Sequence, residues 1–228
     1  MIVIDIKYPA EDIAKIKRSF EKFGCAQIYD SAMEYCQRIE LDVTCVTTDN
    51  VLAAPVYPVN TNNDMLPCIQ ALEHTPKGWC VFLNNTASRS EALAGDIYCT
   101  AACSQGLAGI VINGAIRDID HLDSISIPVY AREITFQSAK TAEVPAAELP
   151  QKVNIDDVTL SYGDWIFADS DGMLVVKREH LSAVFASATI LHKQEERFRR
   201  KLESGERLSV LIGLDAFLRG EQELRADI

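Results

Sequence analysis

Arg117 and Asp118 are neighbouring residues of opposite charge at the end of the stretch 95–118, which reads GDIYCTAACSQGLAGIVINGAIRD. A guanidinium stabilises negative charge that develops on a substrate oxygen, and a carboxylate oxygen is a ligand for hard divalent cations. The same stretch opens with Gly95-Asp96 ahead of an apolar run of helical character. The N–H groups at the start of a helix bind anions such as carboxylates. These residue types would suit a site that holds an anionic substrate and stabilises charge on one of its oxygens.

A short apolar strand, Gly109–Ile112, is expected between these two pairs and to end at Asn113-Gly114, just before Arg117-Asp118. In an open α/β unit, ligands are held by helix N-termini and by the loops that leave the carboxyl ends of strands. We therefore expect Gly95-Asp96 and Arg117-Asp118 to line two sides of one site. On the residues alone, two simpler interpretations stay open: the charged pair is a loop salt bridge, and Asp96 is a helix N-cap.

Three segments carry a resemblance to a known family: GLAGIVINGAIRD at 106–118, IPVYAR at 127–132 and YGDWIFADSDGMLVV at 162–176. The chain resembles the class II pyruvate aldolases, which include the 4-hydroxy-4-methyl-2-oxoglutarate and 4-carboxy-4-hydroxy-2-oxoadipate aldolases and the protein called regulator of ribonuclease activity A. The likeness runs from about Ala26 to about Glu206 and is strongest after Gly95.

The resemblance implies a divalent-metal-dependent carbon–carbon lyase that forms a pyruvate enolate. It would cleave a small 2-oxo acid of the 4-hydroxy-2-oxo type by a retro-aldol reaction, or decarboxylate oxaloacetate. The residue matching Arg117 binds pyruvate in that family, and the residue matching Asp118 is a direct ligand of magnesium or manganese. Such a cation acts as a Lewis acid on the keto oxygen.

Other roles in the site also follow from the resemblance. Asp96 would help to hold the water that serves as acid or base, while the backbone N–H groups of Gly95, Asp96, Ile97 and Tyr98 suit the substrate carboxylate. A glutamate on a later helix reaches the site of the adjacent subunit in the family, and the spacing favours Glu195 over Glu196. Family members form trimers, often paired into hexamers, so an inter-subunit active site is implied.

Two alternatives remain. The regulator branch of the family is a non-catalytic protein that binds a ribonuclease, and it lacks the acidic residue that Asp96 matches. A same-scaffold enzyme recruited to another keto-acid reaction is the second alternative, because the chain departs from the family pattern. Asn113 replaces an aspartate often found before the glycine, Ile155-Asp156-Asp157 replaces a glycine-rich turn, and Tyr162 replaces a proline.

The composition limits the class of protein. The chain has 228 residues, 48% of them apolar and 24% charged, with a net charge of -11. These are values of a globular protein, and the negative charge repels the phosphates of nucleic acids. No apolar run reaches the ~18 residues of a membrane span, and the start MIVIDIKYPAED lacks the features of a signal peptide. Seven cysteines without a CxxC motif are typical of buried thiols in a reducing compartment, so a cytoplasmic protein is expected.

The order of the elements predicts one α/β domain over 1–228, layered α/β/β/α, with a mainly parallel sheet, a second β layer and a long C-terminal helix. Residues 1–24 would contain an N-terminal helix that stops at Gly24, and 179–228 would form a helical extension that contacts a neighbouring subunit. The further helices are expected at Asp30–Arg38, Met65–Glu73 and from Gly95. The further strands are expected at Val43–Thr47, Trp79–Leu83, Val153–Ile155, Val158–Leu160, Trp165–Ala168 and Met173–Val176. Val51–Val59 contains two prolines and is expected to be an edge strand or an extended loop.

Overall fold

A nine-stranded sheet organises the computed structural model, which describes residues 8–86, 91–141 and 148–224. The strand order is β1-β11-β10-β3-β4-β6-β7-β2, and β5 pairs with β6 beside this path. One half of the sheet is parallel and consists of β3 (Leu52–Thr61), β4 (Cys80–Asn85), β6 (Gly109–Ile116), β7 (Val129–Ile134) and the short β5 (Ala92–Ala94). The antiparallel strands are β10 (Trp165–Ala168), β11 (Met173–Val176), β1 (Cys36–Arg38) and, at the far edge, β2 (Thr44–Cys45).

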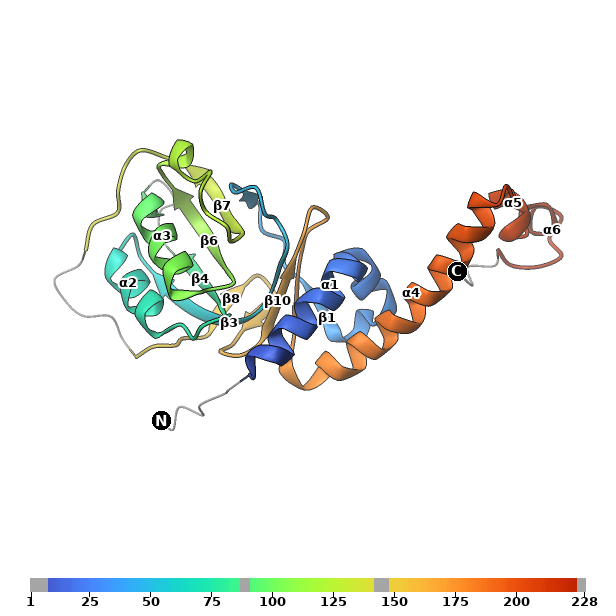
Figure 1. Ribbon diagram of the computed structural model, residues 1–228, viewed down its shortest axis with the longest axis horizontal. Coiled ribbons are helices and arrows are strands. Elements are labelled where there is room, and N and C mark those ends of the chain that lie inside the picture. Colours follow the sequence, from blue (N-terminus) through green and yellow to red (C-terminus); the bar gives the residue numbers. More distant parts are fainter. Residues whose placement is uncertain (1–7, 87–90, 142–147, 225–228) are drawn as a thin grey trace.

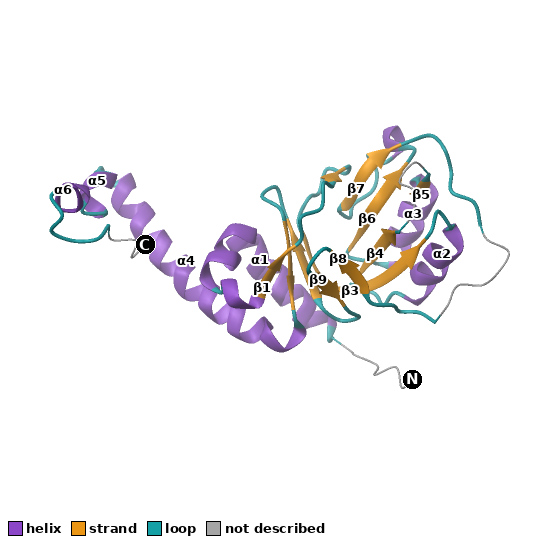
Figure 2. Ribbon diagram, turned by 180° about the vertical axis from the view of Figure 1, so that it is seen from behind, coloured by secondary structure: helices purple, strands orange, loops and turns teal. Residues whose placement is uncertain are grey.

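Helices cover the two halves of the sheet on opposite sides of the molecule (Figures 1 and 2). On the parallel half lie α2 (Met65–His74) and α3 (Asp96–Gln105), whose buried residues share one apolar cluster with β4 and β6. On the antiparallel half lie α1 (Ala10–Ser31) and α4 (Leu181–Glu203), packed on the aromatic side chains of β10. Short 3-10 turns occupy Met33–Tyr35, Ile119–His121 and Arg178–His180.

A third apolar cluster lies between the parallel half and the antiparallel half of the sheet. It joins Val111 of β6 and Tyr130 of β7 to Ile166 of β10. The same cluster includes the separate two-stranded sheet formed by β8 (Val153–Ile155) and β9 (Val158–Leu160). The layers therefore run from α2 and α3, through the parallel half and then the antiparallel half of the sheet, to α1 and α4. The predicted α/β class is confirmed, with a mostly parallel sheet, a second small sheet and a long C-terminal helix.

The expectation for Val51–Val59 was wrong, because β3 is a buried central strand rather than an edge strand or loop. Its two prolines lie at positions where the missing N–H costs no hydrogen bond between strands. The Val56 N–H donates to the Asp164 carbonyl on the β10 side, and strand alternation places the nitrogen of Pro58 on that same side, beyond the end of β10. The nitrogen of Pro55 faces the β4 side, where pairing begins only at Val56.

Gly24 breaks the first helix, as predicted, but the helix then resumes. Gly24 has φ 70° and ψ 174°, which is not helical. The next residue, Cys25, donates its N–H to Asp169 Oδ2 at 2.7 Å, so a carboxylate from the β10–β11 turn caps the resumed segment. The helix expected at Asp30–Arg38 was wrong, since the chain turns at residues 33–35 and then enters β1.

The strand from Gly109 is longer than predicted and runs through Asn113-Gly114 to Ile116. The Asn113 side chain is satisfied inside the sheet, because it donates to Asn84 Oδ1 at 2.7 Å and accepts from Arg132 Nη1 at 2.9 Å. The pairing of β6 with β7 shifts register between Ile112 and Ala115. A polar amide and a glycine therefore form an irregularity within the strand rather than its end.

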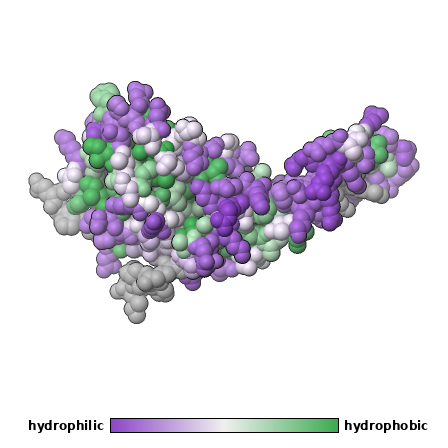
Figure 3. Space-filling model, viewed as in Figure 1, coloured by the Kyte–Doolittle hydropathy of each residue, from purple (hydrophilic) through white to green (hydrophobic). Residues whose placement is uncertain are grey.

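The C-terminal part of α4 extends away from the sheet and leads to α5 (Leu208–Leu211) and α6 (Leu214–Leu218) (Figure 1). In the space-filling view this extension is mostly hydrophilic, whereas apolar and polar residues mix over α2 and α3 (Figure 3). The predicted contact of this extension with a neighbouring subunit stays a prediction, as does the division of the chain at 24 and 179. In the part of the chain that the structure describes, none of the helices has the length and apolar composition needed to cross a bilayer.

Candidate functional site

The residues that the sequence singled out between Gly95 and Asp118 meet at one cavity. Its volume is about 260 Å³, and it lies between α2, the start of α3 and the carboxyl ends of β5 and β6. Gly95, Asp96, Ile97, Tyr98, Arg117 and Asp118 all line it. The two pairs separated in sequence are thus on one site, which is the arrangement that a parallel α/β unit favours.

Arg117 and Asp118 follow directly on the buried end of β6. The Arg117 N–H donates to the Ala94 carbonyl of β5 at 3.1 Å, which fixes the backbone of the pair against its neighbouring strand. Arg117 Nε lies 3.1 Å from Asp118 Oδ2, and the two side chains are 38% and 32% exposed. The salt bridge that the sequence left open is therefore present. It is only partly buried, so both groups remain open to a ligand in the cavity.

Asp118 has a left-handed backbone, with φ 59° and ψ 35°. Residues other than glycine adopt this conformation infrequently, although aspartate and asparagine tolerate it better than most. Backbone conformations of this kind concentrate at ligand-binding positions, where surrounding structure holds them. Here the turn directs the carboxylate back toward the start of α3.

Gly95 is the residue against which the charged pair packs. A Cβ added at Gly95 would overlap Asp118 Oδ2 and lie 3.1 Å from Arg117 Cγ. The backbone of Gly95 is extended, so the requirement for glycine comes from this close approach rather than from φ. Gly95 is also the N-cap of α3, and its carbonyl accepts the Cys99 N–H at 3.0 Å. The helix start is thereby held in contact with the charged pair.

The first turn of α3 supplies a carboxylate and N–H groups to the cavity. Asp96 Oδ1 accepts the N–H of Ile97 at 2.8 Å, which is a local bond within the turn. The Tyr98 hydroxyl donates to the Cys68 carbonyl at 2.9 Å inside the core, and burial raises the pKa of Tyr98 well above its usual range. The Tyr98 side chain therefore holds α3 on α2, and the part of Tyr98 that fits the predicted role is its backbone N–H, which has no partner within the helix.

Glu195 lies elsewhere in its own chain, on α4. Its carboxylate accepts a hydrogen bond from Gln27 Nε2 of α1, and the Gln27 Oε1 atom lies 2.9 Å from His192 Nδ1. Glu196 faces Arg200 and His192 along the same helix instead. Neither glutamate lines the cavity of its own chain. The prediction that Glu195 acts in a neighbouring subunit's site is not tested by these contacts and stays a prediction.

The oxygen donors at the cavity fit a magnesium-type site of low protein coordination. Within the described ranges, no group of three or more His, Cys, Asp or Glu side chains is placed to enclose a metal. Asp118 and Asp96 nevertheless both line the cavity. Magnesium is commonly held by one or two carboxylates, with water and substrate oxygens completing its shell. This donor set therefore suits a hard divalent cation shared with a substrate.

The sequence reasoning missed the apolar wall of the cavity. α2 contributes Met65, Ile69 and Leu72, and α3 contributes Ala101. The signal was present as the i, i+4, i+7 spacing of the three α2 residues, which marks one helix face. Ile69 is 49% exposed on that face, and an exposed position within an apolar stripe is recognisable only when the neighbouring helix is known.

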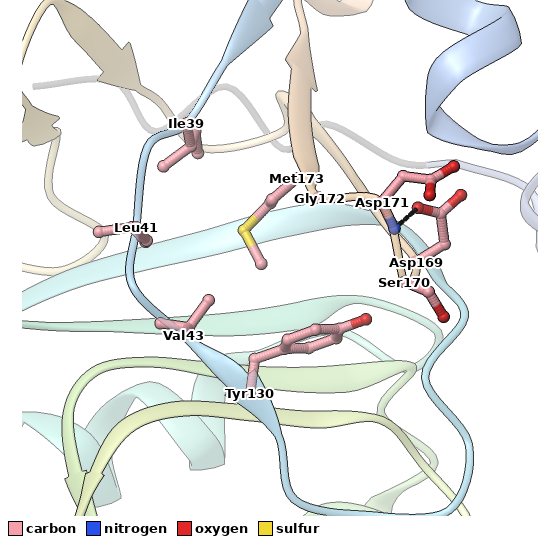
Figure 4. A pocket seen from close by; sticks show the side chains of 9 residues that line it. All are labelled: Ile39, Leu41, Val43, Tyr130, Asp169, Ser170, Asp171, Gly172 and Met173. Carbon is pink, nitrogen blue, oxygen red and sulfur yellow. Dashed lines mark hydrogen bonds between the residues drawn. The ribbon is translucent and has the colours of Figure 1, made fainter.

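A second hollow, also of about 260 Å³, lies beside the β10–β11 turn. Figure 4 shows Met173 and Tyr130 inside it, with Asp169 and Asp171 at one side. It is lined by Ile39, Leu41, Val43, Tyr130, Asp169, Ser170, Asp171, Gly172 and Met173. Asp169 Oδ1 accepts the Asp171 N–H at 2.9 Å, which is the bond drawn in the figure, and its Oδ2 accepts the Cys25 N–H. The Asp169 N–H also donates to the Gly172 carbonyl at 3.1 Å, so these contacts form a tight turn between β10 and β11.

Comparisons with known proteins identify the family of the chain. Residues 25–175, more than half of the chain, match a family model described as RraA-like, Aldolase/RraA. Over 129 residues the chain is 30% identical to "Putative 4-hydroxy-4-methyl-2-oxoglutarate aldolase 2" of Arabidopsis thaliana, covering 57% of this chain and 76% of that protein. It is 29% identical over 137 residues to protein DlpA of Legionella pneumophila, which covers 60% of this chain but only 22% of the length of DlpA.

A solved structure of an uncharacterized protein from Pseudomonas syringae pv. tomato has a TM-score of 0.74 with this chain, at 20% sequence identity, and covers 90% of this chain and 98% of that one. That likeness shows a shared fold. The family match at 25–175 includes α2, α3 and the Arg117-Asp118 pair, and so contains the whole described lining of the cavity. The chain therefore belongs to the RraA-like, Aldolase/RraA family, as its sequence resemblance predicted.

Proposed function

We propose that the protein is a divalent-metal-dependent carbon–carbon lyase that releases pyruvate from a 4-hydroxy-2-oxo acid, and also from oxaloacetate by decarboxylation. The observation that carries this proposal is the Arg117–Asp118 pair, which lines one cavity together with Asp96 and the N-terminus of α3. The family relative named "Putative 4-hydroxy-4-methyl-2-oxoglutarate aldolase 2" supports it.

The substrate carboxylate and keto group would bind between the two sides of the site. The N–H groups of Asp96 and Tyr98 at the start of α3 suit the carboxylate, and the Ile97 N–H would join them by leaving Asp96 Oδ1. The Arg117 guanidinium would lie beside the keto oxygen, where it stabilises negative charge. Asp118, with Asp96 nearby, would hold the cation, which when bound supplies Lewis-acid stabilisation of that same charge.

Cleavage requires removal of the proton from the C4 hydroxyl as the C3–C4 bond breaks. C4 then leaves as a carbonyl compound, and the electron pair remains as the enolate of pyruvate, which takes a proton at C3. Asp96 is the carboxylate in the described cavity that is placed at the helix start and free of Arg117, so we assign it to orient the water that moves these protons. We further propose that Glu195 of an adjacent subunit completes this step in a trimer or hexamer.

Release of pyruvate, followed through a coupled lactate dehydrogenase, tests the proposal. Oxaloacetate and 4-hydroxy-4-methyl-2-oxoglutarate would each be supplied with magnesium, with manganese, and with a chelator in excess. We expect turnover that requires the cation and that is restored when the cation is added back. If no pyruvate is released from either substrate with any cation, the lyase assignment is wrong, and a non-catalytic binding role on this scaffold becomes the better explanation.

A further inference from the structure

Two kinds of side chain line the cavity. Asp96, Arg117 and Asp118 form its charged part, at the start of α3 and just after β6, where Arg117 and Asp118 pack on Gly95. The apolar part consists of Met65, Ile69 and Leu72 of α2 with Ile97 and Ala101 of α3. If the pyruvate half of a substrate binds at the charged part, the group on C4 is placed to contact the apolar part.

From this arrangement we infer that the site selects 4-hydroxy-2-oxo acids whose C4 substituent is an uncharged alkyl chain over those that carry a second carboxylate. The inference rests on the proposed lyase function and specifies its substrate class. It differs from the dicarboxylic substrate named for the relative from Arabidopsis thaliana.

Charge is the first reason. Among the described residues that line the cavity, Arg117 is the one cationic side chain, and it is paired with Asp118 at 3.1 Å. Within this described lining, a second carboxylate on the substrate would therefore meet apolar side chains and two aspartates, with the Arg117 guanidinium already paired. Placing a charge against apolar surface without a partner is unfavourable.

Exposed apolar surface is the second reason. Ile97 is 76% exposed and Ile69 is 49% exposed, and both stand on the cavity wall. An alkyl chain that covers these two side chains removes apolar surface from water on both partners, which favours binding in proportion to the area buried. A carboxylate at the same place gains nothing from that contact.

The test compares kcat/KM for pyruvate release from 4-hydroxy-2-oxohexanoate and from 4-hydroxy-4-methyl-2-oxoglutarate, with oxaloacetate as the reference for the common chemistry. We expect the alkyl substrate to be favoured at least about tenfold, which is within the range that an apolar pocket achieves for small differences in a substrate. The I69R variant places a guanidinium on the apolar wall and should reverse the preference, whereas I69M should keep it. I190R alters an isoleucine on α4 that is 62% exposed and does not line the cavity, and it should leave the ratio unchanged.

The outcomes separate the two ideas. Pyruvate release from oxaloacetate, combined with equal or better use of the dicarboxylic acid, overturns the substrate inference and leaves the lyase function standing. An I69R variant that lowers kcat/KM for both 4-hydroxy-2-oxo acids by the same factor also overturns it, because Ile69 would then not contact the C4 group. Failure to release pyruvate from all three compounds refutes the lyase function, and the inference falls with it.

Discussion

Two hollows in the described part of the molecule contain similar residues but use them differently. Each has a volume of about 260 Å³, and each is lined by two aspartates. In the hollow beside the β10–β11 turn, both oxygens of Asp169 accept backbone N–H groups, from Asp171 and from Cys25 of α1. In the cavity beside α3, Asp118 is paired with an arginine side chain instead.

This difference distinguishes a structural carboxylate from one that is available to a ligand. Asp169 joins a turn to the break in α1 at Gly24, and each of its oxygens is held by a main-chain hydrogen bond. Asp118 is on a left-handed backbone at the end of β6, is 32% exposed, and can change partners through the side chain of Arg117 alone. The acidic content of a pocket therefore says less about function than the partners of each carboxylate do.

The strongest test of this contrast is Asp118→Asn. Asparagine tolerates the left-handed backbone, so the fold should be kept, while a cation ligand and the charge beside Arg117 are lost. We expect kcat for pyruvate release from oxaloacetate with magnesium to fall by about 10²- to 10³-fold, which is typical for loss of one group that stabilises an oxyanion. Asp171→Asn in the other hollow should retain full activity. Equal activity of the two variants would remove the functional distinction between the hollows.

Glycines in the two regions offer a second contrast. A methyl group in Gly95→Ala would overlap Asp118 Oδ2 and displace the carboxylate, although the extended backbone accepts alanine. A displacement of about 1 Å can cost about 100-fold in rate, and we expect a loss of that order in kcat with little change in the free energy of unfolding.

Gly172 has φ 151° and no other atoms within 4 Å of an added Cβ. Gly172→Ala should therefore lower stability through its backbone and leave kcat unchanged, and the opposite pattern would contradict our account of Gly95.

The sequence predicted that Gly95-Asp96 and Arg117-Asp118 would line one cavity because these residues carry local signals. Gly95 and Asp96 mark a helix start, and Asp64 caps α2 through a side chain that accepts the Leu66 N–H at 2.9 Å. Placement of Gly95 near Arg117 followed from parallel β/α connectivity, which brings helix starts and strand ends to one edge of the sheet.

What could not be predicted depends on partners distant in the chain. Pro55 and Pro58 suggested an edge strand, but their tolerance in the centre depends on where β10 stops and β4 begins. Asn113 suggested a turn, but it is satisfied by Asn84 and Arg132 on the neighbouring strands. In each case a local rule was overridden by a hydrogen-bonding arrangement that only the assembled sheet defines.

Asp169→Ala tests the structural role of the second hollow. The change leaves the N–H groups of Cys25 and Asp171 without their acceptor, and loss of such partners costs about 1–3 kcal/mol. We expect a decrease of that size in the free energy of unfolding by chemical denaturation, with kcat for pyruvate release unaffected. The exposed neighbour gives a control, since Asp171→Ala should change stability by less than about 0.5 kcal/mol. A loss of activity in Asp169→Ala with unchanged stability would show that the hollow itself has a catalytic role.

The smallest expected effect concerns two buried thiols, one in each region. Burial, with a smaller contribution from Cys103 and Asp96, raises the pKa of Cys99 on α3 from 9.0 to about 12. Burial, and then the charge of Asp169, also raises the pKa of Cys25 well above 9.0. Because the folded state disfavours the thiolate, stability is fully present below about pH 9 and falls as the pH rises above it.

Between about pH 8 and pH 9.5 each of these thiols should remove about 0.8 kcal/mol from the free energy of unfolding. The variants Cys99→Ala and Cys25→Ala should each lessen the decline of stability with pH, measured by denaturant titration at several pH values, and they should do so equally. Over this pH range the loss of stability depends on the pKa of the thiol in the unfolded chain, so the charge of Asp169 in the folded protein has no influence on it. A smaller change for Cys25→Ala than for Cys99→Ala would mean that the Cys25 thiol ionises in the folded protein within this pH range, which would contradict the raised pKa that burial and Asp169 give it.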